Sequence, residues 1–151
     1  MNNTIDKKVT SSGGFLFFYN KEEGNIFVIL IKNKKSEYWI PKGKLENDES
    51  QVDAAFREIK EEVGFGSDKI KYIDFCFLDK YIYEDEGKVI QKELYINVFE
   101  VYKKWDPTPE DWNNIDNVCW YKYEDAFNLI SFNKDELIKA QNIFKKYKNI
   151  S

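Results

Sequence analysis

The sequence predicts an α/β protein in which a mixed β-sheet lies between helices, as an α/β/α sandwich. Three observations support this fold class. Strongly apolar segments of strand length alternate with polar turns, two longer segments have helical amphipathic spacing, and no repeat or linker interrupts the chain. The length of 151 residues and a composition of 42% hydrophobic and 33% charged residues suit one globular domain. We expect a flexible N-terminus over residues 1–9 and a single domain over residues 10–151.

The first half of the chain begins with two predicted strands. Residues 15–19, FLFFY, form the first, and residues 26–32, IFVILIK, form a second that is apolar enough to be central. The polar residues 20–25 between them predict a hairpin turn. A loop is expected over residues 33–37, and residues 39–41 lead into the loop before the first helix.

The helix that follows has clear start and stop signals. Ser50 is a favourable N-cap, with Asp53 three residues later, and Gly64 suits the left-handed residue that ends a helix. Its apolar stripe consists of Val52, Ala55, Phe56, Ile59 and Val63.

The second half is expected to add strands and two further helices. In order, we predict a strand over residues 70–83, an acidic turn over 84–88, a returning strand over 92–101, a polar segment over 105–117, a short strand over 118–123, a short helix over 125–129 and an amphipathic helix over 133–148. The last helix is expected to direct Leu137, Ile138, Ile143, Phe144 and Tyr147 inward.

Three carboxylates share one face of the first helix. Glu58, Glu61 and Glu62 are spaced i, i+3 and i+4, so they crowd together opposite the apolar stripe. Such like charges repel unless a cation lies among them. Carboxylate oxygens suit Mg²⁺ or Mn²⁺, and Mg²⁺ held by carboxylates usually also holds substrate phosphates. Gly43, in the loop before the helix, allows a backbone carbonyl to approach such a metal closely.

The segment from Gly43 to Phe65, GKLENDESQVDAAFREIKEEVGF, resembles the Nudix signature G-x5-E-x7-R-E-U-x-E-E-x-G-U, where U is a bulky apolar residue. Every specified position is filled, by Gly43, Glu49, Arg57, Glu58, Ile59, Glu61, Glu62, Gly64 and Phe65. The resemblance implies the same α/β/α architecture and hydrolysis of a diphosphate linked to another moiety, with a divalent metal. It is specific for the family and much less so for the substrate.

The resemblance also implies roles for these residues. Glu58, Glu61 and Glu62 would ligate Mg²⁺, or Mn²⁺, and the Gly43 carbonyl would join them; in some Nudix enzymes the residue matching Glu58 is instead the general base. Arg57 is expected to pair with Glu49 and orient the carboxylates. An acid outside the signature is the other candidate base, and Glu110, Asp111 and Asp116 lie in a loop that can approach the site.

Composition excludes several other kinds of site. The sequence contains no His, which rules out a Ser-His-Asp triad, a His-ligated zinc site and a His general base. A net charge of −4 argues against a stable nucleic-acid partner. Cys76 and Cys119 lie in separate apolar segments and are expected to be reduced. No segment has membrane-spanning length and the N-terminus is polar, so we expect a cytoplasmic protein without a membrane partner, as a monomer or weak dimer.

Clues to the substrate lie next to the signature. The stretch WIPKGKLE resembles the entry to the signature in Nudix diadenosine tetraphosphate hydrolases, and Lys42 and Lys44 are candidate phosphate-binding residues. That group often has His where this chain has Lys44. Related ADP-ribose pyrophosphatases carry a downstream Pro that is missing from residues 79–83, whereas Tyr81 and Tyr83 match the window of a Tyr in dinucleoside polyphosphate hydrolases. Either ring could stack on a base.

The sequence therefore predicts metal-dependent hydrolysis of a nucleoside polyphosphate, with asymmetric cleavage of diadenosine tetraphosphate to ATP and AMP as the preferred hypothesis. Alternative substrates within the family are nucleoside triphosphates, 5′-triphosphorylated RNA and diphosphoinositol polyphosphates. An alternative of another class is a non-catalytic nucleotide sensor, although such modules usually lose signature carboxylates that this chain retains.

Overall fold

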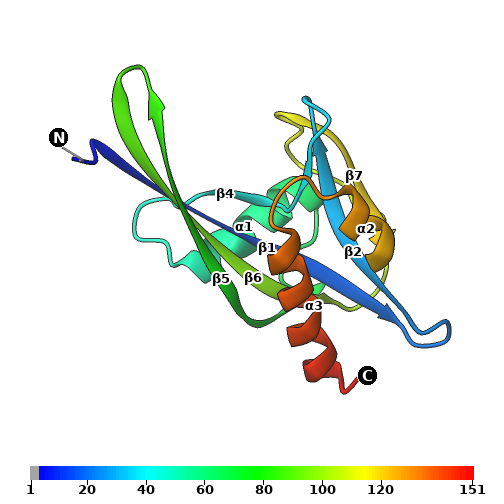
Figure 1. The fold of residues 1–151 in the computed structure, drawn as a ribbon. Coiled ribbons are helices and arrows are strands. Elements are labelled where there is room, and N and C mark those ends of the chain that lie inside the picture. The colour runs from blue at the N-terminus through cyan, green and yellow to red at the C-terminus, as the bar shows by residue number, and fades with distance from the viewer. Residues whose placement is uncertain (1–3) are drawn as a thin grey trace.

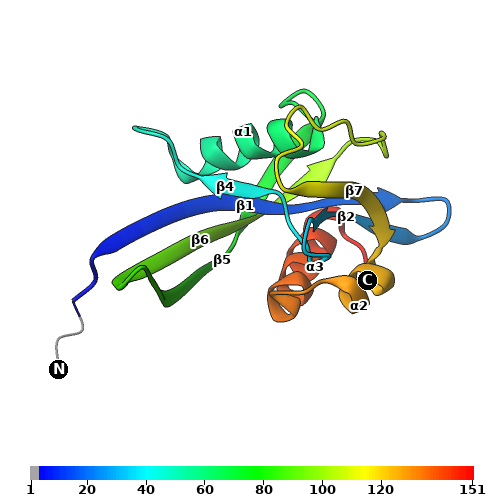
Figure 2. The ribbon, with the colours of Figure 1, turned by 90° about the horizontal axis from the view of Figure 1, so that it is seen from above.

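The computed structural model describes residues 4–151, and residues 1–3 of the expected flexible N-terminus lie outside the described part. Figures 1 and 2 show a sheet with helices on both of its faces, the predicted three-layer arrangement. The strands are β1 (Lys7–Asn20), β2 (Asn25–Asn33), β3 (Tyr38–Trp39), β4 (Lys42–Lys44), β5 (Ile70–Asp85), β6 (Lys88–Val101) and β7 (Ile115–Lys122). The helices are α1 (Gln51–Val63), α2 (Tyr123–Leu129) and α3 (Lys134–Lys148).

The sheet is mixed, as expected. Its strand order is β3-β2-β1-β6-β5, with β4 paired to β1 and β7 paired to β2. Strands β1 and β6 run parallel, from the pair Lys7–Ile90 to the pair Phe17–Glu100, while the other pairs are antiparallel. Because β1 pairs with β4 near Gly13 and with β2 beyond Phe17, it connects the loop before α1 to the centre of the sheet.

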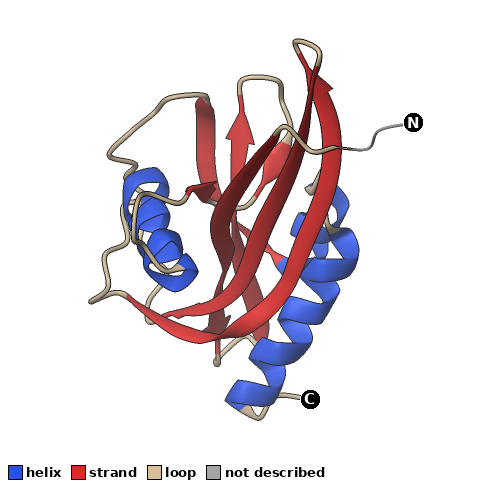
Figure 3. Ribbon diagram, turned by 90° about the vertical axis from the view of Figure 1, so that its left-hand side faces the viewer, coloured by secondary structure: helices blue, strands red, loops and turns tan. Residues whose placement is uncertain are grey.

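Helices lie on both faces of the sheet (Figure 3), and each face has its own apolar core. On one face α1 covers side chains that include Leu16, Ile29 and Phe99. On the other face α2 and α3 cover a second cluster, in which the buried Phe17 ring stacks on Phe144 with centroids 5.2 Å apart. Alternate residues of β1 and β2 therefore face opposite cores, which explains why both strands are continuously apolar.

Several boundaries differ from the sequence expectation. Residues 7–9, assigned to the flexible segment, belong to β1, because β6 extends back to Lys88 and pairs with them. The β5–β6 hairpin closes through Glu86 and Gly87, whose φ angles of 51° and 76° suit a two-residue turn. Strand β7 begins at Ile115, within the segment expected to be polar loop.

Helix α3 buries a slightly different face from the one predicted. Leu137 and Phe144 are buried as expected, but Ala140 and Gln141 complete the buried face. Ile138 and Tyr147, expected to point inward, are each 40% exposed. The small Ala140 lets the helix lie close to the sheet. A prediction of the buried face that relies on large apolar side chains misses this residue. Within residues 4–151, no helix combines the length and apolarity needed to cross a membrane.

Candidate active site

Helix α1 begins and ends as its sequence indicates. The Ser50 side chain accepts a hydrogen bond of 3.0 Å from the backbone N–H of Asp53, so Ser50 is the N-cap. Gly64 ends the helix with φ of 86°, and its N–H donates to the carbonyls of Ile59 and Lys60. Ala55, Ile59 and Val63 pack into the core, which fixes the rotation of the helix and leaves its acidic face toward β4.

Arg57 holds the loop before α1 and the acidic face together. Its Nε and Nη2 atoms donate to the two carboxylate oxygens of Glu49 at 2.8 and 3.0 Å, so the pair expected from the sequence is bidentate. Nη2 also donates to the Lys44 carbonyl at 2.8 Å, and Nη1 donates to Glu58 Oε1 at 2.7 Å. The longer contact between Arg57 Nη1 and Glu61 Oε1 is 3.4 Å. Arg57 therefore orients Glu58 while it fixes the backbone at Lys44.

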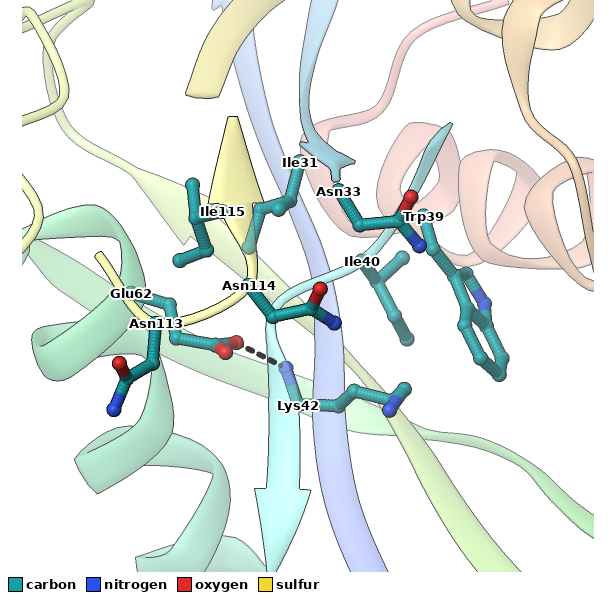
Figure 4. A pocket seen from close by; sticks show the side chains of 9 residues that line it. All are labelled: Ile31, Asn33, Trp39, Ile40, Lys42, Glu62, Asn113, Asn114 and Ile115. Carbon is teal, nitrogen blue, oxygen red and sulfur yellow. Dashed lines mark hydrogen bonds between the residues drawn. The ribbon is translucent and has the colours of Figure 1, made fainter. Parts of the chain in front are cut away.

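Strand β4 contacts the other end of the acidic face. The backbone N–H of Lys42 donates to Glu62 Oε1 at 2.8 Å, which is the dashed contact in Figure 4. Lys42 and Glu62 line a cavity of about 100 Å³ together with Asn113 and Asn114 from the loop before β7. Figure 4 shows the Lys42 side chain running away from Glu62 toward the Trp39 ring.

Gly43 leaves the space in which Glu58 lies. A Cβ atom at this position would overlap the Glu58 carboxylate, so any other residue would displace the carboxylate from β4. The requirement for glycine at the first position of the signature is therefore steric in this chain.

Burial and like charge perturb the acidic face. The pKa of Glu62 is raised to about 7, chiefly by burial; the neighbouring Glu58 and Glu61 also raise it, while the Lys42 N–H and ammonium oppose the shift. Burial also raises the pKa of Glu58, although Arg57 acts in the opposite direction. Glu49 differs, because its hydrogen bond from Arg57 lowers its pKa. Glu58 and Glu62 are thus partly desolvated carboxylates on the same face of α1, so this face has a deficit of positive charge.

This deficit fits a hard divalent cation. Within residues 4–151, no group of three or more Asp, Glu, Cys or His side chains is already arranged around a metal position. Glu58 is turned to Arg57 and Glu62 to the Lys42 N–H instead. The candidate metal ligands are nevertheless all oxygen atoms. Because Gly43 has no Cβ, its backbone lies directly beside the Glu58 carboxylate. These residues therefore suit Mg²⁺ or Mn²⁺.

The loop between β6 and β7 lies across the end of α1. The backbone N–H groups of Glu110 and Asp111 both donate to the Glu61 carbonyl, at 2.8 and 3.1 Å, and that of Thr108 donates to the Val63 carbonyl. Two of the three predicted loop acids are thus fixed beside the carboxylate helix. Asp116 instead forms an ion pair of 3.6 Å with Lys32 on β2.

An aromatic cavity of about 460 Å³ lies on the α2/α3 side of β4. It is lined by Trp39, Asp79, Tyr81, Phe132 and Asn133. Tyr81 is one of the two tyrosines expected to contact a base. Tyr83 contacts the Tyr81 ring, with centroids 6.1 Å apart, but it is not part of the cavity lining.

Three lysines on β4 and β6 belong to the strands that carry or adjoin the aromatic cavity and the acidic face. Lys42 and Lys44 are on β4, and Lys92 on β6 pairs directly with Tyr81 across the hairpin. Burial lowers the pKa of Lys92, and the ammonium groups of Lys42 and Lys44 lower it further. The Lys42 Nζ atom is 4.8 Å from the centre of the Trp39 ring. Ammonium groups of this kind suit the binding of phosphate oxygens.

Comparison with known proteins identifies the fold family. A profile of the NUDIX domain matches residues 12–141, from within β1 to about the middle of α3. The chain belongs to the Nudix family. Nudix hydrolases generally use divalent metal ions, and the acidic face and Gly43 lie within the matched residues.

Solved Nudix structures share the fold at low sequence identity. An Ap4A hydrolase from C. elegans in a binary complex superposes with a TM-score of 0.72 and 20% identity, over 91% of this chain and 98% of that one. The Nudix hydrolase RenU from M. smegmatis gives a TM-score of 0.69 with 12% identity, over 96% and 89% of the two chains.

Curated relatives are more similar in sequence but much longer. The mRNA-decapping enzyme subunit 2 of Saccharomyces cerevisiae is 31% identical over 120 residues, which is 78% of this chain and 11% of the yeast protein. The yeast m7GpppN-mRNA hydrolase shows the same identity and coverage. This Nudix domain therefore spans about a ninth of the length of the curated relatives that it matches.

The structure brings together most of the residues that the sequence singled out. Lys42 contacts Glu62 and Arg57 contacts Glu58 on the acidic face of α1, while Tyr81 lines the aromatic cavity together with Trp39. Sequence reasoning missed Asp79, Lys92, Phe132 and Asn133 as site residues. No local signal marks them, because the β5–β6 register and the position of the α2–α3 loop decide where they lie.

Proposed function

We propose that this Nudix hydrolase cleaves dinucleoside tetraphosphates asymmetrically, converting diadenosine tetraphosphate to ATP and AMP. The observation that carries the proposal is the position of Lys42. Its backbone N–H binds Glu62 on the acidic face, while its ammonium lies over Trp39, which lines the aromatic cavity. A base in that cavity and a phosphate chain along the lysines would therefore lead to the acidic face.

Different side chains would bind the base and the phosphate chain. Tyr81 offers a stacking surface for the base, and Lys42, Lys44 and Lys92 bind phosphate oxygens of the chain. Tyr83, the other tyrosine considered from the sequence, lies outside the cavity lining and would have at most an indirect effect.

Glu58, Glu61 and Glu62, with the Gly43 carbonyl, would hold the divalent metal. Bound there, Mg²⁺ would neutralise phosphate charge and favour ionisation of the attacking water. Arg57 keeps Glu58 oriented through their 2.7 Å contact. A carboxylate must accept the proton of the water; Glu58 is one candidate, and Glu110, fixed beside Glu61 by its backbone, is the other.

The experiment is a substrate panel with purified protein and Mg²⁺. It compares diadenosine tetraphosphate with ADP-ribose and ATP, in ¹⁸O-labelled water, and identifies products by mass spectrometry. We expect ATP and AMP from the dinucleotide and loss of activity in EDTA. Faster cleavage of ADP-ribose or ATP would overturn the substrate assignment, and binding without turnover would favour a nucleotide sensor.

Capped RNA is a second candidate substrate. It is supported by the 31% identity to the yeast decapping proteins, higher than the identity to the C. elegans hydrolase. The net charge of −4 offers little attraction for a long RNA, which is why we rank it second. A short capped RNA in the same panel distinguishes the two: release of the capped nucleotide faster than dinucleotide cleavage would reverse this order.

A further inference from the structure

The aromatic cavity has a polar edge whose orientation is fixed. Asn133 Nδ2 donates to Asp79 Oδ2 at 3.2 Å. A carboxylate only accepts hydrogen bonds, so the amide nitrogen of Asn133 must face Asp79 and the amide oxygen must face elsewhere. Asp79 keeps its second oxygen, Oδ1, free of that contact. Two acceptor atoms of these residues therefore lie outside this contact, Asp79 Oδ1 and the buried Asn133 Oδ1.

Two buried polar atoms of the cavity residues have no partner. Within residues 4–151, Trp39 Nε1 and Asn133 Oδ1 are the buried side-chain atoms of this kind. Buried polar atoms almost always have a hydrogen-bond partner, and both exceptions belong to residues that line the same cavity. One is a donor and the other an acceptor, so a ligand that supplies the opposite pair would satisfy both.

The aromatic residues fall into two roles. The Trp39 ring already contacts Lys42 Nζ at 4.8 Å from its centroid and the Phe132 ring at 4.7 Å between centroids. This leaves its N–H edge as the part of Trp39 that a ligand would use. Tyr81, which is 38% exposed, retains a ring face for stacking.

We propose that this cavity selects guanine over adenine, with Trp39, Asp79 and Asn133 as the specificity-determining residues. The proposal rests on the proposed function, because it names the base at that same site. Guanine offers the acceptor O6 beside two donors, N1–H and the N2 amino group, and these match the donor of Trp39 and the acceptors of Asp79 and Asn133. Adenine offers N1 as an acceptor and only its amino group as a donor on that edge, so one acceptor of the cavity stays unpaired.

Entry of the base requires a local rearrangement. Trp39 Nε1 and Asn133 Oδ1 lie below the protein surface, whereas Phe132 is 39% exposed and sits in the loop between α2 and α3. The Phe132 ring turns away from Trp39 as the base enters and packs on the base instead. Side-chain changes of this size are common on binding.

The test measures affinity for GTP and ATP by calorimetry in EDTA, so that neither nucleotide is hydrolysed. We expect GTP to bind roughly tenfold more tightly than ATP, the discrimination typical of a well-matched base contact. Asp79→Asn leaves one carbonyl oxygen to serve both Asn133 Nδ2 and the base, so it should reduce the preference to about threefold or less. Asp85→Asn, an exposed acid at the end of the same strand outside the cavity, is the matched control and should keep the full preference.

Hydrolysis of diguanosine and diadenosine tetraphosphate separates the two proposals. A preference for the guanine dinucleotide in kcat/KM, lost in Asp79→Asn, supports both. Equal use of the two dinucleotides, or a preference that Asp79→Asn leaves unchanged, overturns guanine selection while the proposed function stands. Tighter GTP binding without cleavage of either dinucleotide supports guanine selection and overturns the proposed function. Absence of binding by either nucleotide, together with absence of cleavage of either dinucleotide in Mg²⁺, overturns both.

Discussion

The backbone and the side chain of Lys42 contribute to the site in separate ways. Strand β4 pairs Lys42 with Gly13, and a Cβ on Gly13 would overlap the Pro41 carbonyl, so the two strands approach unusually closely. This approach brings the Lys42 N–H to Glu62. Burial lowers the pKa of its ammonium, while Glu62 and Glu58 oppose that shift. The ammonium is therefore poorly solvated, which favours contact with an anionic ligand.

The first residue prediction concerns the acidic face. We expect Glu62→Gln to lower kcat by several orders of magnitude, because the variant loses a carboxylate while its amide oxygen still accepts from the Lys42 N–H and the fold is kept. Arg57→Ala should lower kcat less, by about 10–100-fold, because Arg57 acts through Glu58. Steady-state kinetics with circular dichroism measure both. Glu22→Gln, in the exposed β1–β2 turn, is the control, and near-normal turnover of Glu62→Gln would refute the metal-ligand role.

The second residue prediction uses the tyrosine pair. Stacking of a base on an aromatic ring contributes about 1–3 kcal/mol, so Tyr81→Ala should raise KM roughly five- to hundredfold with a smaller change in kcat. Tyr81→Phe should nearly restore KM because the ring is kept. Tyr83→Ala is the matched control, since Tyr83 has similar exposure but lies outside the cavity lining. An equal rise of KM in both Ala variants would show that the cavity does not define the base site.

Among the elements, α1 and the loop before β7 depend on each other. Gly64 ends the helix with φ of 86°, and a Cβ there would overlap the Thr108 carbonyl. The same loop donates backbone hydrogen bonds to Glu61 and Val63. The end of the helix, the loop and the candidate base Glu110 therefore form one packed unit.

This packing predicts unequal effects at two glycines. Gly24 has φ of 72° but open space around its Cβ position, so Gly24→Ala should cost only about 1–2 kcal/mol for the left-handed conformation. Gly64→Ala should lower the free energy of unfolding by more, because the added methyl group also displaces Thr108. Urea unfolding of both variants measures the difference. Equal losses would mean that the loop moves aside without cost.

Sequence analysis succeeded where an element is specified locally. The caps of α1, the Arg57–Glu49 pair and the shared face of Glu58, Glu61 and Glu62 all follow from spacing within one segment. It was less successful where two segments must meet. Lys92 lies beside Tyr81 only because of the hairpin register, and Asn133 reaches Asp79 from a distant loop. The inward face of α3 was misjudged because the sheet accommodates Ala140 there instead of a larger side chain.

At the scale of the whole molecule, the buried carboxylates of the acidic face lower the stability of the folded protein. Glu58 and Glu62 both have raised pKa values because burial disfavours their charge, so ionising them opposes folding. Glu62 has the larger shift, to a pKa of about 7, compared with about 4.3 for an unfolded glutamate. Between these values the folded state binds more protons than the unfolded state. Stability must therefore fall as pH rises through this window.

The last prediction follows from this fall of stability with rising pH. In EDTA, we expect the free energy of unfolding of the native sequence to decrease between pH 4.5 and 7.5, with Glu62 contributing on the order of 3 kcal/mol. Glu62→Gln should remove this contribution, so that the variant is the more stable protein at pH 7.5 although it is inactive. Mg²⁺ should stabilise the native sequence more than the variant, because the ion compensates the buried charge. Urea titrations at both pH values, with and without Mg²⁺, measure these effects; identical pH profiles of the two proteins would show that the Glu62 carboxylate is hydrated in solution.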